Sequence, residues 1–101
     1  MNTESCAMVR VSPPESPGSL WDLNVGEFFF RTGDDGQVWF NAMFPGDNLC
    51  CLPIRPLIDP KTNGGHSWEW DKNEDKPTLT PSVNAVGCWH GWVRAGRMVS
   101  C

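Results

Sequence analysis

The sequence contains no tyrosine, only 8 lysine and arginine residues, and no apolar run approaching the length of a membrane span. The formal net charge is −4, whereas a protein that holds a nucleic-acid duplex needs clustered basic side chains to displace counterions. We therefore expect no direct nucleic-acid binding and no membrane attachment. Residues 1–20 lack the apolar core of a secretory signal, so we expect a cytoplasmic protein with reduced cysteines.

Recognisable catalytic motifs are also missing. The chain has no glycine-rich loop of the kind that cradles phosphate groups. Ser82 lies between a proline and a valine, not in the nucleophile elbow of a hydrolase. These absences favour a protein that works by binding.

The residues that are present describe a small β-rich domain. A length of 101 residues suits one domain, and 10 glycines with 9 prolines favour short strands and turns over long helices. Six tryptophans and five phenylalanines supply most of the large apolar side chains. We predict an all-β fold, a small antiparallel sandwich or barrel built from hairpins, over residues 21–101. Residues 1–20 are expected to form a flexible Pro/Ser-rich arm, in which Val9 and Val11 could add an edge strand.

Turn residues divide the domain into expected strands. These strands cover residues 27–31, 37–44, 49–54, 67–71, 77–83, 88–94 and 97–101. The last two should form a hairpin that turns at Ala95 and Gly96. A two-residue turn there places Arg94 opposite Arg97, and the same register places His90 opposite Cys101.

This hairpin suggests a metal site. Cys88 shares a strand face with His90 because the two are separated by one residue, so three zinc ligands converge with Cys101. The fourth ligand could come from Cys50, Cys51 or His66. Cys51 is the preferred one, since Cys50 shares its strand face with apolar residues. The competing interpretation is a set of buried thiols and one hydrogen-bonded histidine, because no Cys-x-x-Cys pair is present.

Surface residues for a protein partner are expected near the same hairpin. Trp89 and Trp92 are candidate aromatic anchors, because buried aromatic side chains dominate many protein interfaces. Glu69 and Asp71 alternate with tryptophans on the strand at 67–71, where they would present an acidic face.

The C-terminal part of the chain resembles a known group of proteins. The residues that carry the resemblance are Trp68, Trp70 and Asp71, the Pro-Thr-Leu-Thr-Pro-Ser stretch at 77–82, and the Trp-His-Gly-Trp stretch at 89–92. They are similar to small phage and prophage proteins of unknown function, some of which carry a misleading "ammonia monooxygenase" label. The resemblance implies action inside a bacterial host cytoplasm and assigns no catalytic residue.

Two functions follow from these observations as expectations. The first is a non-enzymatic phage-type binding protein that acts on a host protein, such as an inhibitor of a CRISPR-Cas defence system. The alternative is a zinc-dependent enzyme with a Cys/His site around His90 and Glu69 as the general base. A metal assay separates them, because a catalytic zinc keeps an open coordination position.

Overall fold

The computed structural model describes residues 5–15, 17–85 and 89–100, and the strands in these ranges form two sheets. The four-stranded sheet has the order β2-β3-β4-β5 and the five-stranded sheet the order β1-β9-β8-β7-β6. The strands are β1 (Ser5–Ala7), β2 (Val9–Arg10), β3 (Glu27–Thr32), β4 (Val38–Phe44), β5 (Asn48–Pro53), β6 (Glu69–Trp70), β7 (Leu79–Ala85), β8 (Trp89–Arg94) and β9 (Arg97–Ser100). The all-β prediction is confirmed, and the described strands form two stacked sheets instead of a closed barrel.

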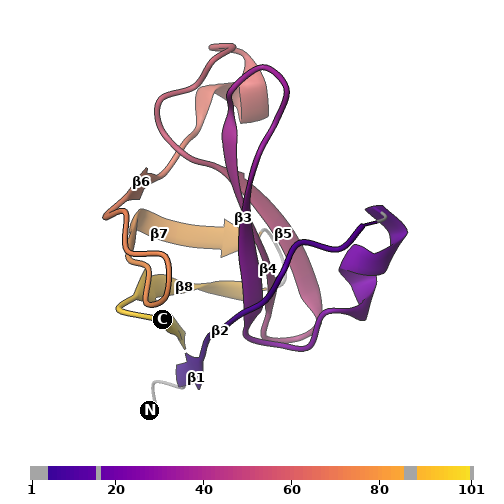
Figure 1. Ribbon diagram of the computed structural model, residues 1–101. Helices are drawn as coiled ribbons and strands as arrows, with labels where there is room; N and C mark the ends of the chain where they lie inside the picture. The colour runs from indigo at the N-terminus through magenta and orange to yellow at the C-terminus, as the bar shows by residue number, and fades with distance from the viewer. Residues whose placement is uncertain (1–4, 16, 86–88, 101) are drawn as a thin grey trace.

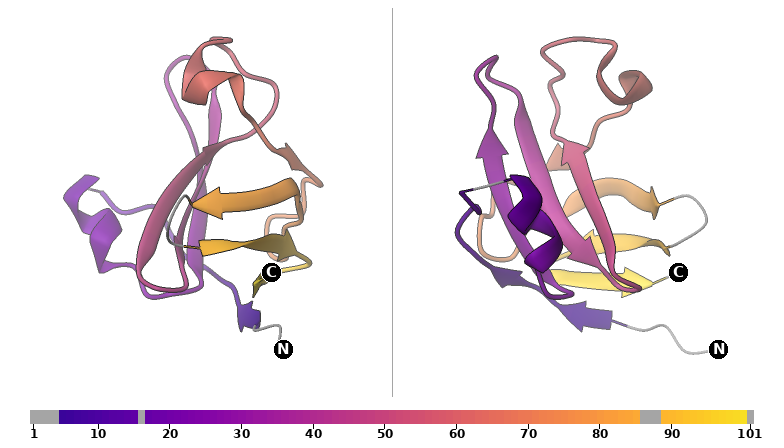
Figure 2. Two further views of the ribbon diagram at one scale, coloured as in Figure 1. Left: turned by 180° about the vertical axis from the view of Figure 1, so that it is seen from behind. Right: turned by 90° about the vertical axis from the view of Figure 1, so that its right-hand side faces the viewer.

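The core lies between the two sheets, whose strands cross one another (Figures 1 and 2). Phe28, Phe40 and Phe44 point inward from the four-stranded sheet because alternate residues of a strand share a face. Val93 and Trp89 point inward from the five-stranded sheet. The ring centroid of Trp89 lies 4.9 Å from that of Phe44. Each such apolar side chain contributes about 1.5–3 kcal/mol when it is fully buried.

The hairpin of β8 and β9 has the register that the sequence predicts. Ala95 and Gly96 have φ values of 46° and 78°, and a two-residue turn with two positive φ angles matches the right-handed twist of the strands. Arg94 pairs with Arg97, and the last described pair is Gly91 with Ser100. The predicted pair of His90 and Cys101 would be the next one, but Cys101 lies outside the described residues.

Gly91 in β8 is required by packing. A Cβ atom at this position would collide with the carbonyl oxygen of Val99 and would lie 2.6 Å from the ring of Trp89. The missing side chain therefore leaves the space into which the indole of Trp89 folds. This glycine explains how a tryptophan fits beneath the β8–β9 hairpin.

The N-terminal segment differs from an unpaired arm. β1 is antiparallel to β9, and β2 is parallel to β3, so residues 5–10 add one edge strand to each sheet. The edge strand expected around Val9 is thus present. A 3-10 helix, η1 (Pro17–Asp22), follows it, and a second, η2 (Thr62–Gly65), lies in the loop after β5. Neither described helix is long and apolar enough to cross a membrane.

Candidate functional site

A cleft opens where the chain passes from one sheet to the other. Trp68 forms a parallel bridge with Ile54 beside the four-stranded sheet, and the next two residues pair with the start of β7 as β6. Because β6 begins only at Glu69, the chain before it is not paired with the part of β7 beyond Thr80. The cleft between them has a volume of about 510 Å³ and is lined by Leu52, Asn63, His66, Ser67, Trp68, Pro81, Ser82 and Asn84.

One wall of the cleft is an irregular part of β7. Leu79 pairs with Val93 and Val83 pairs with Gly91, so β7 advances four residues (83 − 79) while β8 advances two (93 − 91). Such a bulge bends a strand and changes the direction of a side chain. Leu79 and Val83 both remain buried, while Ser82 between them is half-buried and lines the cleft.

Ser82 and His90 meet across the two strands. The Nε2 atom of His90 lies 3.4 Å from the Oγ atom of Ser82. His90 belongs to β8, where its cross-strand partner is Asn84, two residues beyond Ser82. A serine hydroxyl beside an exposed imidazole is the arrangement of a nucleophile and its general base, and such contacts are often long before substrate binds. In the described part of the chain, no carboxylate hydrogen-bonds to the His90 ring.

Trp68 fixes the backbone at the serine. Its indole Nε1–H donates to the carbonyl oxygen of Ser82 at 3.3 Å. The backbone of Trp68 is itself held on both sides: its N–H donates to Pro53 at 3.0 Å, and its carbonyl oxygen accepts from Arg55 at 2.8 Å. The indole therefore connects the bulge of β7 to the end of β5, and it limits the movement of Ser82.

The structure describes two of the four predicted zinc ligands, Cys51 and His90, and places them on opposite sides of the core. Cys51 is exposed on the outer face of the four-stranded sheet, while His90 is exposed on the outer face of the five-stranded sheet, with the core between them. Cys88 and Cys101 lie outside the described residues. No group of three or more metal-binding side chains occurs in the ranges that the structure covers. Zinc binding stays a prediction, which a metal analysis of protein purified without chelators would test.

The two predicted tryptophan anchors occupy different environments. Trp89 is 8% exposed, packs in the core, and donates from Nε1 to the hydroxyl of Ser100 at 3.1 Å. Trp92 is half-buried on the outer face of β8, where the guanidinium of Arg94 lies 4.4 Å from its ring centroid. Of these two tryptophans, only Trp92 is accessible to a partner, and it lies on β8 next to β7, the strand that lines the cleft.

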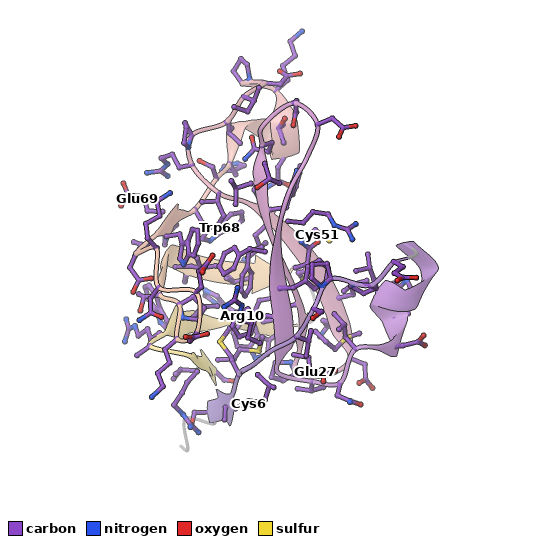
Figure 3. The ribbon with its side chains drawn as sticks, in the orientation of Figure 1. Cys6, Arg10, Glu27, Cys51, Trp68 and Glu69 are labelled. Atoms are coloured by element: carbon purple, nitrogen blue, oxygen red, sulfur yellow. The ribbon has the colours of Figure 1, made fainter. Side chains whose placement is uncertain are left out.

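The two predicted acidic residues hold local structure at the surface. Glu69 lies at the outer edge of the molecule and forms an ion pair with Arg55 at 3.2 Å (Figure 3). Asp71 accepts hydrogen bonds from the backbone N–H groups of Asn73, at 3.0 Å, and Thr78, at 3.2 Å. Asp71 therefore closes the loop that leads into β7.

Ser82 is the residue that sequence reasoning missed. No nucleophile elbow surrounds it in the sequence, yet a bulged strand can also bring a serine into a cleft. Only the pairing of β7 with β8 brings it beside His90. That register could not be read from the sequence, because β7 carries extra residues opposite β8.

Comparison with protein families gave one finding. The family model described as "bacterial ubiquitination-like system serine protease (BubE)" matches residues 27–101. Ser82 and His90 both fall within the matched region. No curated protein and no solved structure matches the chain.

This match corrects four expectations. The assignment to the phage and prophage group is wrong, and so is the role as an inhibitor of a host defence such as CRISPR-Cas. The expected non-enzymatic function is also wrong, because the matched family is one of enzymes. The zinc-dependent alternative is replaced by the serine chemistry that the family description names. An expected protein partner is consistent with the description, since a ubiquitination-like system acts on proteins.

Proposed function

The chain belongs to the BubE family, and on this premise we propose that it is a serine hydrolase of a bacterial ubiquitination-like system, with Ser82 as nucleophile and His90 as general base. The observation that carries the proposal is the 3.4 Å contact between His90 Nε2 and Ser82 Oγ beside the cleft. A serine protease requires a hydroxyl activated by an adjacent base. Of the two histidines in the chain, His90 is the one with this contact.

The reaction follows the general course of acyl transfer. His90 Nε2, as the neutral imidazole, takes the proton from Ser82 while Oγ attacks the substrate carbonyl carbon. The tetrahedral intermediate collapses, the bond from carbon to the leaving group breaks, and His90 returns the proton to that group. Water then hydrolyses the acyl-serine ester by the same steps, with His90 again taking and returning the proton. No redox partner is needed for the balance.

Trp68 supports this assignment by its hydrogen bond to the Ser82 carbonyl oxygen, at 3.3 Å. A nucleophile must be held within a fraction of an ångström of its reacting position, and tertiary contacts supply that order better than an unsupported loop. Trp68 is a positioning residue in this scheme, since it acts through the backbone of Ser82.

The substrate we propose is an extended segment of a protein in the ubiquitination-like system, either the ubiquitin-like modifier itself or a protein joined to it. An acyl bond at the end of such a modifier is the type of bond that serine chemistry cleaves. The cleft of about 510 Å³ suits a few residues of extended chain. Among its described lining residues there is no Asp, Glu, Lys or Arg, which favours small uncharged side chains in the segment.

A fluorophosphonate probe tests the nucleophile directly. Intact-mass measurement should show one adduct on the wild-type protein, and peptide mapping should locate it at Ser82. Ser82→Ala should remove the adduct. Ser67→Ala is the matched control, because Ser67 lines the same cleft but its hydroxyl accepts a hydrogen bond from Arg55 Nε at 3.1 Å. An adduct that persists in Ser82→Ala, or that disappears in Ser67→Ala, would contradict the proposal.

A further inference from the structure

Asn84 lies beside both members of the proposed catalytic pair. It follows Ser82 by two residues in β7, so the two share a strand face, and it is directly opposite His90 in β8. Its side chain is exposed and lines the same cleft as Ser82. Within the described residues, no hydrogen bond engages its side-chain amide. Asn84 therefore presents two free N–H donors to the cleft.

Three other groups around Ser82 have no free N–H to donate. Asn63 donates from Nδ2 to the carbonyl oxygen of His66 at 3.2 Å. The Trp68 indole N–H donates to the Ser82 carbonyl oxygen. Pro81, which precedes the serine, has no backbone N–H to offer. Among the cleft side chains, the amide of Asn84 is the available neutral donor nearest to Ser82 in sequence.

The proposed reaction needs such a donor. When Ser82 Oγ attacks a carbonyl carbon, the carbonyl oxygen becomes negatively charged and gains most from N–H groups at about 2.7–3.1 Å. Residues separated by two in a strand are about 6.6 Å apart, so a carbonyl group held between them reaches both side chains.

We propose that Asn84 is a catalytic residue whose side-chain amide donates a hydrogen bond to the oxyanion formed when Ser82 attacks. The proposal rests on Ser82 as the nucleophile. It adds a role that neither the family description nor the Ser82–His90 contact assigns. Because the amide donates its hydrogen bond to the oxyanion and not to the ground-state carbonyl oxygen, removing the amide should lower the turnover number and leave the Michaelis constant unchanged.

Hydrolysis of p-nitrophenyl acetate provides the test without knowledge of the protein substrate. Asn84→Ala should lower kcat by about 10²-fold at unchanged KM, the loss typical of removing one oxyanion donor. Asn84→Asp, which has the same shape but repels the oxyanion, should be at least as slow. Asn48→Ala is the matched control, because it removes a side-chain amide that lies outside the cleft lining and donates to the carbonyl oxygen of Pro45 at 2.8 Å, and it should keep wild-type turnover. A peptidyl boronic acid, which forms a tetrahedral adduct on serine, should lose affinity for Asn84→Ala in parallel with kcat/KM.

The outcomes separate this proposal from the nucleophile assignment. If the fluorophosphonate labels Ser82 and Asn84→Ala turns over at the wild-type rate, the oxyanion role is wrong and the nucleophile stands. A raised KM with unchanged kcat also overturns it, because Asn84 would then bind the ground state. A wild-type protein whose Ser82 is not labelled overturns both proposals. Melting temperature checks the fold of each variant, and an exposed side chain should leave it unchanged.

Discussion

The two sheets of this protein differ in regularity. In the four-stranded sheet, β3, β4 and β5 pair without interruption, from Phe28 opposite Ala42 to Phe44 opposite Asn48. In the five-stranded sheet, β7 shifts its register on β8 between Leu79 and Val83. The first sheet therefore offers a continuous apolar face, and the second offers a local irregularity that brings a hydroxyl beside a histidine.

Because of this difference, we expect the regular sheet to determine the stability of the fold and the irregular strand β7 to carry the reaction. Phe28, Phe40 and Phe44 of the regular sheet are completely buried, so their substitution should act on folding. Ser82 and His90 are half-buried or exposed at the irregular strand, so their substitution should act on the reaction. If the division holds, variants in the two sheets will fall into two classes with little overlap.

The largest expected effect is on catalysis at His90. His90→Ala should lower kcat for p-nitrophenyl acetate by about 10²- to 10⁴-fold, because Ser82 then has no base to take its proton. The melting temperature should change little, since the imidazole is exposed. Steady-state kinetics and thermal unfolding of the same preparation provide the two measurements.

His66→Ala is the control for that experiment. His66 lines the same cleft and is exposed, but the histidine in contact with the Ser82 hydroxyl is His90. The variant should keep activity within about tenfold of wild type, as expected for a residue outside the proton transfer. Equal losses in the two variants would show that the cleft, and not the Ser82–His90 contact, determines the rate.

The next effect is on stability in the regular sheet. Phe40 is completely buried and packs against Phe28 and Phe30, with ring centroids at 5.7 and 5.2 Å. Phe40→Ala should lower the free energy of unfolding by about 3–5 kcal/mol, measured by urea denaturation. Below the unfolding transition, the folded fraction should label with the fluorophosphonate at the wild-type rate. A fully folded variant that is not labelled would contradict the expectation that the regular sheet acts on folding alone.

Short-range signals were sufficient to predict much of the fold. The hairpin of β8 and β9 depends on two neighbouring residues that adopt positive φ, Ala95 and Gly96, and its register follows from that turn alone. The alternation of β4 likewise identifies Phe40 and Phe44 as members of one face. Such features are fixed by residues close together in the chain.

Features that depend on distant pairing could not be predicted. The bulge of β7 exists only against β8, so the sequence around Ser82 gave no sign of a cleft. Trp89 and Trp92 are an odd number of residues apart and face opposite sides of β8, but only the second sheet decides which side is buried. An edge strand around Val9 could be expected from the sequence, but the pairing of β1 with β9 and of β2 with β3 depends on the free edge that each sheet offers.

A smaller effect is expected where the two sheets are joined. Trp68→Phe keeps the ring but removes the indole N–H that bonds to the Ser82 carbonyl oxygen. Loss of one such bond should cost about 1 kcal/mol of stability. Turnover should fall by less than about tenfold, because Ser82 keeps its base but gains freedom to move. An unchanged rate together with the expected stability loss would show that the indole holds the fold without positioning the nucleophile.

The smallest expected effect concerns Cys51, whose exposed position on β5 lies on the opposite side of the molecule from Glu69 (Figure 3). Desolvation by burial raises the pKa of the Cys51 thiol above its ordinary value of 9.0. The folded protein thus holds this proton more tightly than the unfolded chain. The related stability is fully present below the ordinary pKa and is lost as pH rises from there through the raised pKa of the folded protein. Because the thiolate is the reactive form, iodoacetamide should modify Cys51 more slowly in the folded protein than in urea at pH 8, measured by peptide mass spectrometry. Cys51→Ser should hydrolyse p-nitrophenyl acetate at the wild-type rate. A loss of activity in Cys51→Ser would show that the regular sheet takes part in the reaction and would contradict the purely structural role of that sheet.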